Sequence, residues 1–185
     1  VFSIIHLKQV KKMKQTIIRY GLISGIISSI LMLIVSLIGQ SIGFQRFAEY
    51  GVWVGFSAII LSLTLVFIGI KSYRDEQGGG HITFGRAFQI GIFVTVISCV
   101  CYSITWVICY FNFFPTFMDD FGAYHLQKLK ESGESAAEIA KQAAEMRRTK
   151  EMYQNPFYNF AITFMEPFPV GLLMTAVSAF VLRKK

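Results

Sequence analysis

One carboxylate in the sequence could carry out chemistry because of where it lies. Glu166 falls inside residues 157–182, a run that is otherwise uncharged, and Pro167 and Pro169 follow it closely. A charged side chain is costly inside a bilayer, so an acid in such a run indicates a proton relay or a cation site. Glu166, Pro167 and Pro169 therefore form the first candidate functional site.

Structural interpretations of Glu166 compete with the functional one. The prolines free the backbone carbonyls of Thr163 and Met165, which a protonated Glu166 or a water molecule could satisfy. The carboxylate could also lie at the N-terminus of a helix beginning near Pro167, where the helix dipole favours an anion. We expect a kinked helix with a locally paired carboxylate near the outer interface. The other apolar runs hold no second acid, which weighs against a pump or channel.

A second candidate site is the glycine-rich segment that follows the second apolar run. Three consecutive glycines at 78–80 could form an anion-binding nest, but the segment lacks the Gly-Lys-Ser/Thr of a phosphate-binding loop. We expect a tight turn whose basic side chains reach lipid headgroups. The candidate headgroup or partner contacts are Lys71, Arg74, Asp75 and Arg86.

The other reactive residues match no catalytic or metal-binding pattern. Cys99, Cys101 and Cys109 share one apolar run without a histidine, and their spacing is not that of a metal or redox pair. We expect them to be small buried apolar side chains. No zinc-protease motif and no plausible nucleophile–base pair occurs. The sequence thus predicts a protein that is not an enzyme and uses no cofactor or metal.

Composition places these residues in a membrane protein. Of 185 residues, 54% are hydrophobic and only 16% are charged, whereas a soluble chain carries about 25% charged residues. A bilayer-spanning helix needs about 20 mostly apolar residues. Four runs meet this requirement: 20–39, 50–70, 87–114 and 157–182. The fold class predicted is all-α, a bundle of four transmembrane helices.

The distribution of charge predicts the orientation. The two termini and the loop between the second and third runs carry eleven basic and two acidic residues, whereas the other loops carry seven basic and eight acidic ones. Basic loops stay in the cytoplasm. We expect both termini in the cytoplasm and residues 115–156 outside the cell. The net charge of +7 is thereby explained without a nucleic-acid partner.

The external segment, residues 115–156, is expected to form two amphipathic helices. Pro115 is suited to open the first, and Ser132-Gly133 to end it. Ser135 and Glu138 match a capping box for the second. A hairpin of this size cannot bury a core of its own. It must cap the bundle, lie on the membrane surface or dock onto a partner, and capping is the expectation.

Small residues recur at helical spacing in the apolar runs. Such spacing lets helix backbones approach closely in lipid. It is compatible with packing inside one four-helix bundle, which we expect, and with a homodimer seam or a contact with another membrane protein. The candidate packing residues are Gly21, Gly25, Gly51, Gly55 and Gly171.

Motifs throughout the chain resemble one bacterial family. The pattern Gly69-Ile70-Lys71-x-Tyr73-Arg74-Asp75 is followed by Gly79-x-x-Ile82-Thr83-Phe84-Gly85-x-Ala87-Phe88, and further matches fall at 128–133, 145–146, 150–156, 163–166 and 168–172. Together they resemble an uncharacterised bacterial membrane family, domain of unknown function 4199. The resemblance implies a small four-span protein of the bacterial cytoplasmic (inner) membrane, with no assigned activity.

The resemblance begins near Met13. Residues 1–12 are expected to be an upstream extension, because Val1 is not a standard initiator and Met13 precedes the first run directly. Residues 13–185 would then form a single membrane domain.

Two functions follow as hypotheses. The first is a non-enzymatic, multi-pass membrane protein whose external hairpin interacts with a partner or with membrane lipid. The alternative is a small ion- or proton-coupled transporter that uses Glu166.

Overall fold

The chain is helical throughout the part that the structure describes. The computed structural model covers residues 2–184, and within this range it contains seven α-helices and no β-strand. The helices are α1 (Phe2–Ile42), α2 (Phe44–Gln77), α3 (Phe84–Phe113), α4 (Phe117–Glu131), α5 (Ala136–Tyr153), α6 (Pro156–Met165) and α7 (Pro167–Leu182). The predicted all-α fold class is confirmed. Val1, the start of the expected extension, lies outside the described residues.

Four stretches of these helices are long and apolar enough to cross a membrane. They are Gln9–Ile42, Trp53–Gln77, Phe84–Phe113 and Pro156–Leu182. The four predicted spans are therefore confirmed, although the helices continue beyond the apolar runs. The fourth span consists of two helices, because Pro167 and Pro169 cannot donate the backbone hydrogen bonds that would continue α6.

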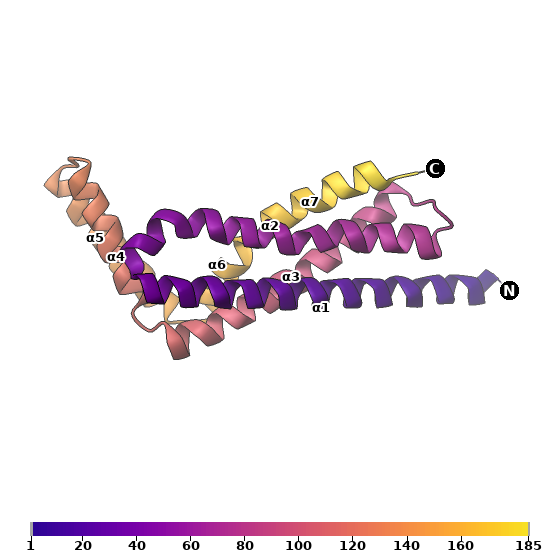
Figure 1. Ribbon diagram of the computed structural model, residues 1–185, viewed down its shortest axis with the longest axis horizontal. Coiled ribbons are helices and arrows are strands. Elements are labelled where there is room, and N and C mark those ends of the chain that lie inside the picture. Colours follow the sequence, from indigo (N-terminus) through magenta and orange to yellow (C-terminus); the bar gives the residue numbers. More distant parts are fainter. Residues whose placement is uncertain (1, 185) are drawn as a thin grey trace.

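The helices form an elongated bundle with two different ends (Figure 1). Both termini and the turn between α2 and α3 lie at one end, the terminal end. The α1–α2 junction and the helices α4 and α5 lie at the other, the hairpin end. This arrangement agrees with the grouping of the basic loops in the sequence, because the termini and the basic turn share one end.

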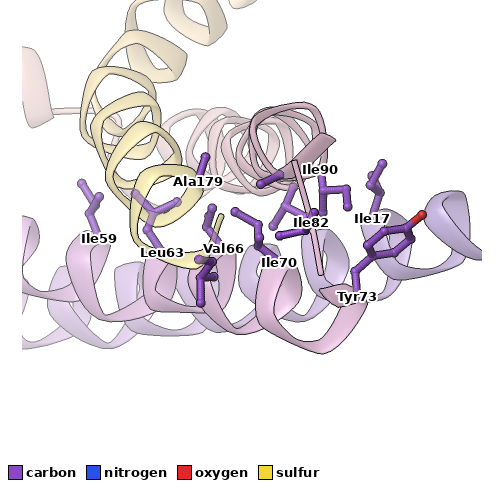
Figure 2. Packing of buried hydrophobic residues seen from close by; sticks show 12 residues of the cluster. Ile17, Ile59, Leu63, Val66, Ile70, Tyr73, Ile82, Ile90 and Ala179 are labelled. Atoms are coloured by element: carbon purple, nitrogen blue, oxygen red, sulfur yellow. The ribbon is translucent and has the colours of Figure 1, made fainter. Parts of the chain in front are cut away.

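The hydrophobic core occupies the terminal half of the bundle. Leu63, Val66 and Ile70 of α2 are almost completely buried, and they face Ile90 of α3 and Ala179 of α7 (Figure 2). Elsewhere, large apolar side chains point outward all around the bundle, as lipid-facing residues do. The terminal half is thus closed by apolar packing.

Buried hydroxyl groups join the helices next to this core. The Ser24 hydroxyl of α1 donates to the Ser62 carbonyl of α2 at 2.9 Å and lies 3.0 Å from the Ser98 hydroxyl of α3. On the other side of α3, the Thr95 hydroxyl donates to the Gly171 carbonyl of α7 at 3.3 Å. Hydrogen bonds of this kind hold helices together where water is absent.

The candidate packing glycines divide into two groups. Gly21 and Gly25 lie against α3, where an added Cβ would come within 2.8 Å of Ile97 and 2.6 Å of Cys101, and Gly171 lies against Thr95 of α3 in the same way. Gly51 instead faces the Phe47 ring of its own helix, and a Cβ on Gly55 would meet nothing within 4 Å. Gly51 and Gly55, expected at a packing face, both border a hollow in the bundle.

The glycine-rich turn is fixed by its backbone and by the C-terminus. Gly79 and Gly80 have φ values of 59° and 83°, which side-chain-bearing residues rarely adopt. The Thr83 hydroxyl then caps α3 by accepting from the Arg86 amide. Ile82 pairs with Lys184 through two backbone hydrogen bonds of 3.1 and 3.0 Å. The turn and the C-terminal end of α7 are therefore tied together.

Close contact between α3 and α7 predicts the effect of enlarging Gly171. We expect Gly171→Leu to lower the free energy of unfolding by about 1–3 kcal/mol, because its side chain must displace Thr95. Thermal unfolding of the purified protein in detergent measures the loss. Gly55→Leu is the matched control and should unfold like the wild type. Equal stability of the two variants would contradict the α3–α7 contact.

Candidate functional site

A large cavity occupies the hairpin half of the bundle. Its volume is about 630 Å³, within the range of small-molecule sites. Residues of α1, α2, α3 and α4 line most of it, and Tyr153 of α5 and Glu166 complete the wall. The wall is largely apolar and rich in aromatic rings, including Phe44, Phe56 and Trp106. The cavity is the strongest candidate site in the described chain.

The cavity exists because the fourth span changes its neighbours at Glu166. On the terminal side of the break, α7 packs against both α2 and α3. On the hairpin side, α6 packs against α3 and α5. The space that α7 fills in the terminal half is thus left open in the hairpin half. Gly55 adds to this space, because a Cβ there would meet nothing within 4 Å, whereas Gly39 and Gly51 lie against the Phe47 ring. The proline break and Gly55 together leave the void open.

Glu166 lies at the break, with its carboxylate at the cavity. It is the N-cap residue of α7, but its side chain makes no capping hydrogen bond. The Tyr102 hydroxyl of α3 instead donates to Glu166 Oε2 at 3.3 Å. The Thr163 carbonyl, freed by Pro167, accepts from the Glu166 amide at 3.3 Å. The expected local partner is therefore a tyrosine on another helix, and the Thr163 carbonyl is satisfied without the carboxylate.

Other polar groups in the cavity wall are few and lie mainly toward the hairpin end. Asp120 of α4 accepts from the Thr116 hydroxyl at 3.0 Å, and the Gln40 amide donates to the Phe113 carbonyl at 3.3 Å. Burial, reinforced by the charge of Glu166, raises the pKa of Tyr153 to about 12. Its hydroxyl therefore stays protonated at neutral pH and can act as a hydrogen-bond donor.

The hairpin of α4 and α5 covers the hairpin end of the bundle. The Phe117 ring of α4 stacks edge-on against Trp106 at 5.0 Å and against Phe44 at 5.7 Å. Met118 and Tyr153 are buried with Tyr110 of α3 in a second small core. The hairpin is thus a cap on the bundle, which is the arrangement expected from its size.

The hairpin forms by the local signals that the sequence contains. The Ser135 hydroxyl accepts from the Glu138 amide at 3.2 Å, as one half of the predicted capping box. The Glu138 carboxylate accepts from the Gln142 side chain at 3.0 Å instead of reaching back. α4 begins at Phe117, two residues after Pro115, and Asn155 caps α6 through the Phe157 amide.

The residues of the second candidate site lie at the opposite end of the molecule. Arg74 and Asp75 form an ion pair of 2.7 Å, so these two charges neutralise one another. Lys71 and Arg86 are exposed. Arg86 lines a hollow of about 220 Å³ between α1 and α3. The structure therefore does not bring this set together with Glu166.

The cysteines remain structural in the fold. Cys99 and Cys109 are buried, Cys101 is partly buried, and all three are free thiols. Among the described residues, no group of three or more histidine, cysteine or acidic side chains is arranged to hold a metal ion.

The sequence singled out Glu166 but not the residues that line the cavity with it. Tyr102 carried one usable signal, since a tyrosine hydroxyl deep in a span needs a hydrogen-bond partner and the apolar runs offered only one carboxylate. Trp106 and Asp120 carried no such signal, because nothing in their spacing shows that they border a cavity.

Comparison with known proteins gives a family and nothing narrower. The sequence profile of one family, described as "Protein of unknown function (DUF4199)", matches residues 19–184. No match was found among curated proteins or among solved structures. The match covers nearly all of the chain and agrees with the motifs in its loops and spans. The chain belongs to the DUF4199 family.

Proposed function

We propose that this protein binds a lipid-like molecule in the cavity, without catalysing a reaction. The cavity itself carries the proposal, because a largely apolar space of about 630 Å³ inside a membrane protein suits an alkyl chain or a small hydrophobic molecule. The few polar groups in its wall would fix the orientation of the ligand. The hairpin would cover the ligand from the outside.

The same proposal includes a location and an orientation. We assign the protein to the cytoplasmic membrane of a bacterium, with both termini in the cytoplasm and the hairpin outside. The basic residues at the terminal end support this orientation. The cavity would then open in the outer half of the bilayer, where lipid from the outer leaflet can reach it.

An ion- or proton-coupled carrier is the second candidate, and one observation favours it. The Glu166 carboxylate borders the cavity and pairs with a neutral tyrosine, as a proton-binding group would. The core opposes this function, because Leu63, Val66 and Ile90 close the bundle between the cavity and the terminal end. A carrier would have to open that core in each cycle.

The carrier hypothesis is tested with vesicles that hold the purified protein and a pH-sensitive dye. We expect an imposed pH gradient to decay no faster than in protein-free vesicles, because the core leaves no path for protons. Glu166→Gln should behave identically. A faster decay that Glu166→Gln abolishes would favour the carrier over the binding protein.

The orientation predicts which loop a membrane-impermeant maleimide reaches in intact cells. In a variant whose native cysteines are replaced by alanine, we expect Glu134→Cys in the hairpin turn to be labelled. His81→Cys in the α2–α3 turn should react only after permeabilisation. Both positions are exposed, so access depends on the side of the membrane alone. The reverse labelling pattern would overturn the orientation.

Ligand binding is measurable because the chain has two tryptophans, and only one borders the cavity. In a Trp53→Phe protein, Trp106 fluorescence reports on the cavity. We expect an uncharged brominated alkyl glycoside to quench Trp106 saturably in nanodiscs of phosphatidylcholine. Trp53 is 76% exposed, so a Trp106→Phe protein reports quenching from the bilayer. Half-saturation at Trp106 should need about tenfold less probe than at Trp53.

A plugged variant supplies the control for this measurement. Gly55→Phe projects a ring into open space in the cavity wall and should reduce quenching of Trp106 to the bilayer level. Gly55→Ala is the matched small substitution and should leave the quenching unchanged. If Trp106 and Trp53 are quenched alike in every variant, the cavity takes up no ligand.

A further inference from the structure

The cavity carries negative charge without a positive partner. Glu166 and Asp120 both line it, and none of its lining residues is a lysine or an arginine. Among residues 9–51 and 53–184, the ion pairs join Arg74 to Asp75, Lys128 to Glu131, Lys141 to Glu138 and Lys150 to Asp119. The chain nevertheless has 18 basic and 11 acidic residues. The cavity is thus acidic in a basic protein.

The Glu166 carboxylate lies in an apolar wall without a positively charged partner. Glu166 is exposed at the cavity and the bundle surface, but inside a membrane span this exposure is not to bulk water. A charge there costs free energy unless an opposite charge or hydrogen bonds compensate it. Glu166 has one hydrogen bond within the described chain, from Tyr102 at 3.3 Å. A cation entering the cavity would supply the missing compensation.

The rings near Glu166 suit an organic cation better than a metal ion. Tyr102, Trp106 and Tyr153 line the cavity with Glu166. Aromatic faces attract ammonium groups, most strongly where water is excluded. A divalent metal ion would need several oxygen ligands, and no cluster of acidic or histidine side chains is arranged for one in the described chain.

The outer part of the cavity suits an alkyl or aryl tail. Phe44, Phe47 and Phe56 of α2 and Phe117 of α4 contribute rings to its wall. Asp120 lies in the first turn of α4, at the end of the cavity that the hairpin covers. Its charge would attract a cation toward the entrance and repel an anion.

We infer that the ligand is a cationic amphiphile, whose ammonium group pairs with Glu166 among these rings and whose tail lies along the phenylalanines. This inference rests on the proposed function, since it names the class of molecule that the cavity takes. It also distinguishes among amphiphiles: an anionic headgroup meets two acids and no base, and a neutral one forms no ion pair.

Three probes with one brominated dodecyl chain test the inference in the Trp53→Phe protein. Their headgroups are trimethylammonium, maltoside and sulfate, and the readout is saturable quenching of Trp106 in phosphatidylcholine nanodiscs. The Trp106→Phe protein measures how much of each probe enters the bilayer, and this value normalises each titration. We expect the ammonium probe to bind about tenfold more tightly than the maltoside, and the sulfate to bind most weakly.

Variants then assign the preference to Glu166. Glu166→Gln should make the ammonium and maltoside probes bind equally, whereas Glu166→Asp should retain the preference. If Glu166→Gln does not fold, the order of the three probes in the Trp53→Phe protein still decides the question.

Three results would count against the inference, and they are distinguishable from failure of the proposed function. Equal binding of the ammonium and maltoside probes would overturn it, as would a preference that survives Glu166→Gln, or tighter binding of the sulfate. In each of these cases the cavity still binds an amphiphile. If instead no probe quenches Trp106 saturably, and Gly55→Phe changes nothing, the proposed function itself fails.

Discussion

Helices in a bilayer gain no hydrophobic energy by touching, so this fold depends on where their backbones can approach. They approach at a few small residues in the terminal half. Gly25 lets α3 lie against α1, and the Ser24 hydroxyl bridges α1, α2 and α3 at one level. Thr95 and Gly171 join α3 to α7 nearby. In the hairpin half, α1 and α3 still meet through Ser29 and Thr105 at 2.9 Å, but among the described residues no side-chain hydrogen bond there joins them to α2. This difference allows a cavity to remain beside α2.

The proline pair links the fold to the candidate site. A continuous fourth helix would keep one set of neighbours along its length and would leave Glu166 as a costly acid on a packed surface. The break at Pro167 lets α6 lean toward α3 and α5 while α7 stays between α2 and α3. It thereby creates the void and aligns the carboxylate with it. The break in the fourth span is thus the structural origin of the candidate site.

The sequence predicted the spans, the shared end of the termini, the hairpin and the position of Glu166 within the fourth span, because each depends on local composition. It could not predict the cavity. Gly25 and Gly55 each lie four residues after another glycine, yet a Cβ on Gly25 would meet Cys101 and one on Gly55 would meet nothing within 4 Å. A glycine indicates close packing only where another helix lies against it, and its position in the tertiary structure decides whether one does. Tyr102 was missed for the same reason, since its partner lies 64 residues away.

The two ends of the bundle also differ in what it costs to open them. Separating helices at the terminal end would expose Val66 and Ile90 and break buried hydrogen bonds. Lifting the hairpin would break the edge-on ring contacts of Phe117 and expose the small core that Met118 and Tyr153 form with Tyr110. The ion pair between Lys150 and Asp119 lies within the hairpin and would remain. Local opening follows the cheapest contacts. A ligand should therefore enter and leave beside the hairpin, with the terminal half as the rigid base on which Glu166 is held.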